Sequence, residues 1–220
     1  MLENIKACLF DMDGTIIDSM WIWKEVDIEI LNKFNISLEK IEQIQADIEG
    51  ISFTQTATYF KDVLNIPLSV DEIIDMFNEM AFEEYTTKVP YKKGALEFLK
   101  YCKKHGIKTA ICTSNSRELA EAVGEVLGFL PYMDTVITSC EVPNGKPFPD
   151  IYLEAAKQVL VDPAECMVFE DVMAGIYAGK AAGMKVCAIE DAHSMPQKAE
   201  KQEIADYYIE DYFEIIGRDE

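Results

Sequence analysis

The sequence has few basic residues, and that shortage excludes two classes of partner. Lysine and arginine together number 20 among 220 residues, against 40 aspartates and glutamates, so the formal net charge is −20. Such an acidic protein repels nucleic acid and anionic lipid, and we expect neither as a partner. It also repels phosphorylated metabolites, unless a local positive group or a metal ion reverses the sign of the charge.

Long apolar runs and CxxC pairs are also absent from the sequence. No stretch approaches the roughly 18 apolar residues of a membrane span, and the opening MLENIK lacks a basic start followed by an apolar stretch. Three of the six cysteines, Cys8, Cys112 and Cys187, stand inside short apolar runs. We therefore expect buried free thiols and a cytoplasmic location.

Six short apolar runs are present, and they predict the strands of one sheet. They cover residues 5–10, 107–113, 134–139, 166–170, 185–190 and 205–210. Most are rich in Val, Ile, Cys and Ala and alternate little, which is typical of parallel strands buried on both faces. Helical patterns at residues 92–106, 116–128 and 149–160 separate them. This alternation predicts an α/β fold with a doubly wound parallel sheet.

The alternation of predicted strands and helices is interrupted after the first strand. Residues 17–86 contain three helical patterns, at 20–34, 52–64 and 69–85, and no run typical of a buried strand. Ser52 and the capping box formed by Ser69 and Glu72 mark the starts of the second and third patterns. We therefore predict an α/β core of residues 1–16 and 87–220 and an all-helical insertion of residues 17–86, with hinges near 16–20 and 86–91.

Two aspartates directly follow the first predicted strand. Because side chains alternate along a strand, Asp11 and Asp13 point to the same side. Their repulsion is tolerable when a cation lies between them or when one is protonated. Gly14 lets the backbone turn sharply, and ligands of open α/β sheets bind beyond the carboxyl ends of strands. A solvated turn is the purely structural alternative.

Two later motifs suit a phosphate group. Thr113, Ser114 and Asn115 end the second predicted strand, where a hydroxyl and free amides at a helix N-terminus can hold an anion. Lys146 stands in a turn between a glycine and a proline and offers a positive charge. Taken singly, each motif is explained as well by a helix cap or a surface turn.

A fourth motif, Glu170 and Asp171, ends another predicted strand with oxygens of the kind that Mg²⁺ prefers. The four motifs together resemble those of the haloacid dehalogenase superfamily of phosphohydrolases. They are DxDGT at 11–15, Thr-Ser-Asn at 113–115, Lys-Pro-x-Pro-Asp at 146–150 and Glu-Asp-x-x-x-Gly at 170–175. The insertion resembles the small helical cap of the β-phosphoglucomutase-like branch.

The resemblance implies a role for each acidic residue. Asp11 would be the nucleophile that forms an aspartyl-phosphate, and Asp13 would be the general acid and then the general base. Asp11, Asp171 and the backbone carbonyl of Asp13 would bind Mg²⁺, with Glu170 supporting the site.

The resemblance also implies how the phosphate is bound. Thr113 and the amides of Ser114 and Asn115 would hold the phosphoryl oxygens, and Lys146 would balance their charge. A carboxylate is a poor nucleophile toward an anion, so a lysine and a metal ion are needed to neutralise the repulsion.

The cap residues favour hydrolysis of a phosphate ester. Within the superfamily that the chain resembles, dehalogenases and phosphonatases lack an acid at the position of Asp13, so this aspartate points to phosphate esters. Mutase relatives carry a cap histidine where this chain has Trp23, and basic residues where it has Glu49 and Phe53, which would not bind a second phosphate. We therefore expect a phosphatase acting on a small phosphorylated metabolite, a sugar phosphate being one such class. A phosphomutase is the first alternative, and a non-catalytic binding protein is the second.

Trp23, Glu49 and Phe53 are the candidate residues for substrate specificity, together with Trp21 and Ile51, although packing of the cap core would explain the aromatic residues equally well. We assign no role to the two histidines and expect a monomer.

Overall fold

A six-stranded parallel sheet forms the centre of the computed structural model, which describes residues 1–217 except 38, 40 and 49. Its strands are β1 (Ala7–Phe10), β2 (Lys108–Thr113), β3 (Thr135–Thr138), β4 (Cys166–Glu170), β5 (Lys185–Ile189) and β6 (Tyr207–Ile209). They lie in the order β3-β2-β1-β4-β5-β6, and every neighbouring pair is parallel. The chain thus winds from β1 to one edge and returns to build the other half, which confirms the doubly wound α/β fold.

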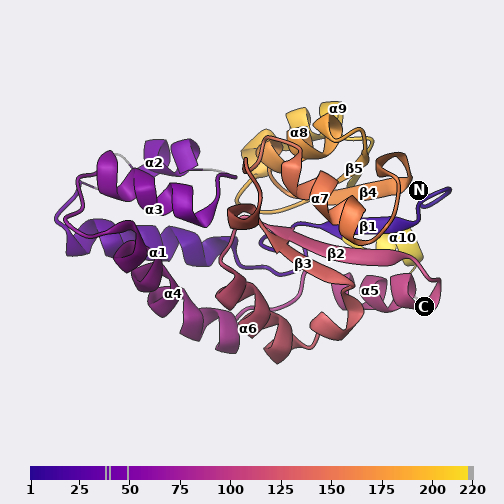
Figure 1. Ribbon diagram of the computed structural model, residues 1–220, viewed down its shortest axis with the longest axis horizontal. Coiled ribbons are helices and arrows are strands. Elements are labelled where there is room, and N and C mark those ends of the chain that lie inside the picture. Colours follow the sequence, from indigo (N-terminus) through magenta and orange to yellow (C-terminus); the bar gives the residue numbers. More distant parts are fainter. Residues whose placement is uncertain (38, 40, 49, 218–220) are drawn as a thin grey trace.

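Both faces of the sheet are covered by helices (Figure 1). The core helices are α5 (Ala95–Lys104), α6 (Arg117–Leu127), α7 (Asp150–Gln158), α8 (Met173–Ala181), α9 (Lys198–Ile204) and α10 (Phe213–Ile216). Side chains of β1 alternate between the two faces: Cys8 and Phe10 pack with the apolar residues of α5, whereas Ala7 and Leu9 pack with those of α7 and α8. Burial on both faces explains why the strands read as unbroken apolar runs.

Four helices lie together at one end of the molecule, drawn in indigo and purple in Figure 1. They are α1 (Met20–Lys33), α2 (Ile41–Ile48), α3 (Phe53–Asp62) and α4 (Val70–Thr87), and we refer to them as the cap. Capping boxes at Ser52 and Ser69 begin α3 and α4 as expected. The sequence patterns missed α2, a helix of eight residues. No described helix is both long and apolar enough to cross a bilayer.

The two linkers between cap and core run side by side. The amide of Asp18 donates to the carbonyl of Pro90 at 2.9 Å, and the amide of Lys92 donates to that of Ile16, also at 2.9 Å. The cap is therefore joined to the core by a paired, two-stranded connection. The proposed domain boundaries and hinge positions remain predictions, and α4 continues one residue past the predicted boundary at 86.

The cysteines are free thiols, and five of the six are buried. Cys140 is the exception to the expectation from the sequence. It lies exposed in the short 3-10 helix Ser139–Glu141 that follows β3, where no strand buries it.

Candidate active site

Three carboxylates gather at the carboxyl end of the two central strands. Asp11 directly follows β1, Glu170 is the last residue of β4, and Asp171 comes next. Because β1 and β4 pair in parallel with Phe10 opposite Phe169, the residues that follow are level with one another. Oxygens of Asp11, Glu170 and Asp171 lie within 4.8 Å of one another, and all three side chains are buried.

The ammonium group of Lys146 lies among these carboxylates. The Nζ atom of Lys146 is 2.6 Å from Asp11 Oδ1 and 2.5 Å from Glu170 Oε1, and the hydroxyl of Tyr152 donates to the same oxygen of Glu170 at 2.5 Å. Burial disfavours the charged ammonium, but the two carboxylates outweigh it and raise the pKa of Lys146 above its usual value. Lys146 is therefore a fixed positive charge beside Asp11, as the sequence predicts.

Lys146, together with the buried Lys201, whose Nζ donates to the backbone carbonyl of Asp171 at 2.9 Å, leaves some carboxylate oxygens of the cluster without a partner. Glu170 Oε2 and Asp171 Oδ2 are buried without a hydrogen-bond partner. Burial and the neighbouring carboxylates of Asp11 and Glu170 raise the pKa of Asp171, and burial likewise raises that of Asp11, against the opposing effect of Lys146. A cluster of buried carboxylate oxygens with orphaned atoms fits a hard divalent cation such as Mg²⁺.

Two motif glycines make room for this cluster. Gly14 adopts φ +78°, and a Cβ atom there would lie 2.2 Å from Asp171 Oδ2. A Cβ atom at Gly175 would lie 1.7 Å from Glu170 Oε1. Both distances are far below van der Waals contact, so only glycine allows these carboxylates to occupy their positions.

Asp13 stands apart from the cluster and faces the cap. Its Oδ1 accepts hydrogen bonds from Ser19 Oγ at 2.6 Å and from the hydroxyl of Tyr85, which belongs to α4, and its Oδ2 accepts from Asn115 Nδ2 at 3.1 Å. Burial raises the pKa of Asp13, and these hydrogen bonds oppose the rise without cancelling it. A carboxyl group that holds its proton more tightly than usual suits a general acid.

The residues predicted to bind phosphate lie around the same opening. Ser114, Asn115 and Lys146 line one cavity with Asp11 and Asp13. Thr113 is buried behind them. Its Oγ1 accepts the backbone N–H of Asn115 at 3.0 Å, and Ser114 Oγ donates to the carbonyl of Gly50 in the cap segment at 2.9 Å. Phosphate binding by Thr113, Ser114 and Asn115 stays a prediction.

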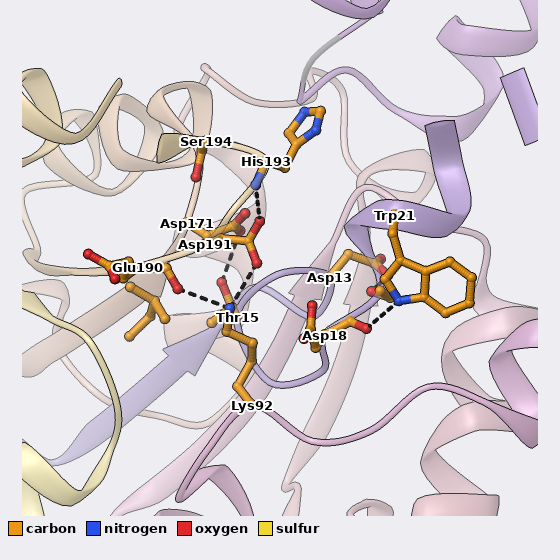
Figure 2. A network of polar contacts seen from close by, with 12 residues as sticks. Asp13, Thr15, Asp18, Trp21, Lys92, Asp171, Glu190, Asp191, His193 and Ser194 are labelled. Atoms are coloured by element: carbon orange, nitrogen blue, oxygen red, sulfur yellow. Dashed lines mark hydrogen bonds and ion pairs between the residues drawn. The ribbon is translucent and has the colours of Figure 1, made fainter. Parts of the chain in front are cut away.

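This cavity, of about 160 Å³, lies between the core and the cap and is lined by residues of both. Of the predicted specificity residues, Trp23, Ile51 and Phe53 line it. Trp21 does not: the residue is 38% exposed, and its indole N–H donates to the carbonyl of Asp18, as Figure 2 shows. Glu49 lies outside the described residues.

A polar network that the sequence did not reveal lies beside the cluster (Figure 2). Asp191, in the loop after β5, pairs with Lys92 at 2.8 Å and accepts the backbone N–H of His193 at 2.8 Å. Thr15 donates to Asp171 Oδ1 at 3.1 Å. The loop that carries His193 is thereby tied to the linker at Lys92, and His193 itself reaches the cavity wall.

The cap contributes further cavity residues that sequence reasoning missed. Asp27 and Gln45 line the cavity beside Trp23 and Phe53. Asp27 belongs to a predicted helical pattern without a motif, and Gln45 belongs to α2, which the sequence patterns missed. Nothing in their spacing distinguishes them from surface residues. Arg117, the first residue of α6, is not one of the cavity-lining residues. It lies on the surface and pairs with Glu121 and Glu141, as a solvated arginine does.

Comparison with known proteins identifies the family. Residues 5–183 match the family model described as "Hydrolase: haloacid dehalogenase-like hydrolase". The chain belongs to this family. The resemblance inferred from the four strand-end motifs is thereby confirmed, and so is the prediction of an enzyme of this superfamily.

Two relatives carry the names of phosphatases. The bifunctional riboflavin kinase/FMN phosphatase of Arabidopsis thaliana is 32% identical over 216 residues, covering 97% of this chain and 55% of that protein. Hexitol phosphatase A of Escherichia coli is 31% identical over 195 residues, covering 87% of this chain and 86% of that protein. The chain therefore spans about half of the plant protein and most of the bacterial one.

Solved structures of lower identity share the fold. CbbY from Rhodobacter sphaeroides, in complex with phosphate, superposes with a TM-score of 0.82 at 22% identity, covering 97% of this chain and 96% of that one. β-Phosphoglucomutase from Clostridium difficile superposes with a TM-score of 0.79 at 22% identity, covering 96% of this chain and 93% of that one. At this identity the likeness shows the fold alone.

Proposed function

We propose that this chain is a Mg²⁺-dependent phosphatase that hydrolyses the phosphate monoester of a small metabolite through an aspartyl-phosphate on Asp11. The observation that carries the proposal is the arrangement around Asp11. One of its oxygens lies against the ammonium of Lys146, the carboxylates of Glu170 and Asp171 lie beside it, and Asp13 faces the same cavity.

In the first step, a carboxylate oxygen of Asp11 attacks phosphorus and the bond from phosphorus to the ester oxygen breaks. Asp13 gives its proton to that departing oxygen. Lys146 reduces the repulsion between the Asp11 carboxylate and the incoming dianion. Mg²⁺, held by Asp11, Asp171 and the backbone carbonyl of Asp13 with Glu170 in support, would supply the further positive charge that this approach requires.

In the second step, Asp13 acts as the base. It takes a proton from a water molecule that attacks the phosphorus of the aspartyl-phosphate. The bond between phosphorus and Asp11 breaks, inorganic phosphate leaves, and both aspartates return to their starting states. The same carboxyl group thus serves as acid and base in turn.

The substrate class is supported by the names of the relatives and by the cavity. The plant and bacterial relatives are named for FMN and hexitol phosphates, which are small phosphorylated metabolites. On the cap side, the cavity is lined by apolar residues that include Trp23, Phe53 and Phe77. Among the described cap residues lining it, Lys24 is the only cation, which favours a monophosphate over a bisphosphate.

The test is phosphate release from a panel of metabolite monoesters with Mg²⁺ present. Asp11→Asn should lower turnover by about 10³-fold or more, whereas Asp18→Asn, at an exposed acid seven residues on, should not. Near-full activity in Asp11→Asn would reject Asp11 as the nucleophile.

A phosphomutase remains the alternative because β-phosphoglucomutase shares the fold. Incubation of a hexose 1-phosphate with a trace of the bisphosphate decides between the two. Free phosphate supports hydrolysis, and isomerised hexose phosphate without free phosphate supports the mutase. Failure to process any member of the panel would favour the non-catalytic protein.

A further inference from the structure

A buried carboxyl group in the cap has no role in the chemistry proposed above. Asp27, on α1, is only 4% exposed and lines the same cavity as Asp11 and Asp13. Among the described residues, its hydrogen-bond partner is Gln45 on α2, whose Nε2 donates to Asp27 Oδ2 at 3.3 Å. No described lysine, arginine or histidine forms an ion pair with it.

This arrangement costs stability, since a buried carboxylate normally requires a cation or several hydrogen bonds. Burial raises the pKa of Asp27 to about 7, against the weaker opposing effect of the Gln45 hydrogen bond. Near neutral pH the group is therefore both a hydrogen-bond acceptor and, when protonated, a donor. A cap built only for packing would place an apolar residue at this position.

The surroundings of Asp27 indicate what it binds. Trp23 lies edge-on to Phe53 with ring centroids 5.7 Å apart, and Phe53 contacts Phe77 at 5.5 Å. All three rings line the cavity. An apolar aromatic wall beside one carboxyl and one amide suits the C–H groups of a carbon skeleton that also carries hydroxyls.

We propose that Asp27 and Gln45 form the specificity site for the leaving group and bind a hydroxyl of a sugar or polyol monophosphate. This inference rests on the proposed phosphatase function and names the substrate class of the same site. The phosphate end lies at Asp11 and Lys146, and the hydroxylated end lies against α1 and α2. A cationic amine is disfavoured because Lys24, one turn before Asp27 on α1, lines the same wall.

Three six-carbon substrates separate the possible ligands. Sorbitol 6-phosphate carries hydroxyls along its chain, hexyl phosphate carries none, and 6-aminohexyl phosphate ends in an amine. We expect the wild-type kcat/KM for sorbitol 6-phosphate to exceed that for hexyl phosphate by about tenfold to a hundredfold, because a site built to bond a hydroxyl rejects an analogue that lacks it.

The variants are Asp27→Leu and Gln45→Leu, and Glu29→Gln, at an exposed site on α1, is the matched control. We expect both leucine variants to lower the ratio of the two kcat/KM values toward one and the control to keep it. Should Asp27→Leu fail to fold, Asp27→Asn replaces it and is expected to lower the ratio by a smaller factor.

The outcomes keep this inference distinct from the proposed function. An unchanged ratio in the variants, or a preference for 6-aminohexyl phosphate, would overturn the inference while hydrolysis still stands. Hydrolysis of p-nitrophenyl phosphate without hydrolysis of sorbitol 6-phosphate would do the same. If the protein hydrolyses no phosphate monoester at all, the proposed function fails and the inference fails with it.

Discussion

Buried carboxyl groups lie in two regions of this protein, and their environments differ sharply. In the core, Asp11 lies 2.6 Å from a lysine, and the hydroxyls of Thr15 and Tyr152 bond to the neighbouring acids. In the cap, Asp27 has one long hydrogen bond from Gln45 and no ion pair among the described residues. The core carboxylates therefore have a cation and hydrogen-bond donors beside them before substrate binds. Asp27 in the cap keeps hydrogen-bonding capacity that a ligand could use.

The difference between these regions is informative about their roles. A site for chemistry needs charges fixed before the substrate binds, because reorganisation during the reaction is costly. A site for recognition gains selectivity from a polar group that only the right ligand satisfies. On this account, the core carboxylates set the reaction and Asp27 sets the choice of substrate.

The largest effect is expected from removing the core's own cation. Lys146→Met leaves Asp11 and Glu170 buried without their ammonium, so their mutual repulsion and their repulsion of phosphate both rise. We expect phosphate release to fall by about 10³-fold. The exposed Lys157, changed to Met in the same way, is the control. Activity within tenfold of the wild type would show that Lys146 does not carry the charge balance.

Next comes the glycine that makes room for the cluster. Gly14→Ala places a methyl group 2.2 Å from Asp171 Oδ2 at φ +78°, whereas Gly106→Ala has φ +70° and meets nothing within 4 Å. We expect Gly106→Ala to lower the free energy of unfolding by about 1 kcal/mol from backbone strain alone. Gly14→Ala should lower it by about 3 kcal/mol and also reduce turnover. Equal losses in chemical denaturation would contradict the steric account.

The buried carboxyl group of Asp27 should make the free energy of unfolding depend on pH. Folding raises the pKa of Asp27 to about 7, so the native state binds its proton more tightly than the unfolded chain. Stability is therefore lost as the pH rises from about 4 through 7. Asp27→Asn removes this penalty, and we expect it to stabilise the protein by about 2–3 kcal/mol more at pH 8 than at pH 5.

Urea denaturation at the two pH values measures this difference, with Glu29→Gln as the control. Equal stabilisation by Asp27→Asn at both pH values would mean that Asp27 titrates normally. The contrast between core carboxylates beside a lysine and a cap carboxyl group without an ion pair would then fail on its cap side.

The smallest effect is expected where cap and core meet. Tyr85→Phe removes one of three hydrogen bonds to Asp13 and leaves those from Ser19 and Asn115. We expect kcat to fall by about tenfold with KM changed little, because the loss misplaces the acid and not the substrate. Tyr177→Phe is the control, because the Tyr177 hydroxyl donates to Glu200 at the surface. A change in KM alone would assign Tyr85 to substrate binding.

The core and its site could be predicted from sequence because strand ends are local signals. An apolar run followed by Asp11, or by Asp171, predicts both a strand and its carboxyl end. Parallel pairing places the carboxyl ends of such strands at the same edge of the sheet. Lys146 stands in a turn and not at a strand end, and its role was predicted only through the family resemblance of the Lys-Pro-x-Pro-Asp motif.

The cap site could not be predicted for the opposite reason. Asp27 and Gln45 stand on different helices. Which face of each helix lines the cavity is decided by tertiary packing, which a local sequence pattern does not predict. Tyr85 reaches Asp13 from 72 residues away. The cytoplasmic location and the monomeric state remain predictions.

The most direct test of the account is to look for phosphorus on Asp11. Rapid acid quench during turnover of a hydrolysed monoester, followed by mass spectrometry, should find one phosphoryl group on the peptide that contains Asp11, and none in Asp11→Asn. An unmodified peptide at full turnover, or a phosphoryl group on another residue, would contradict the account.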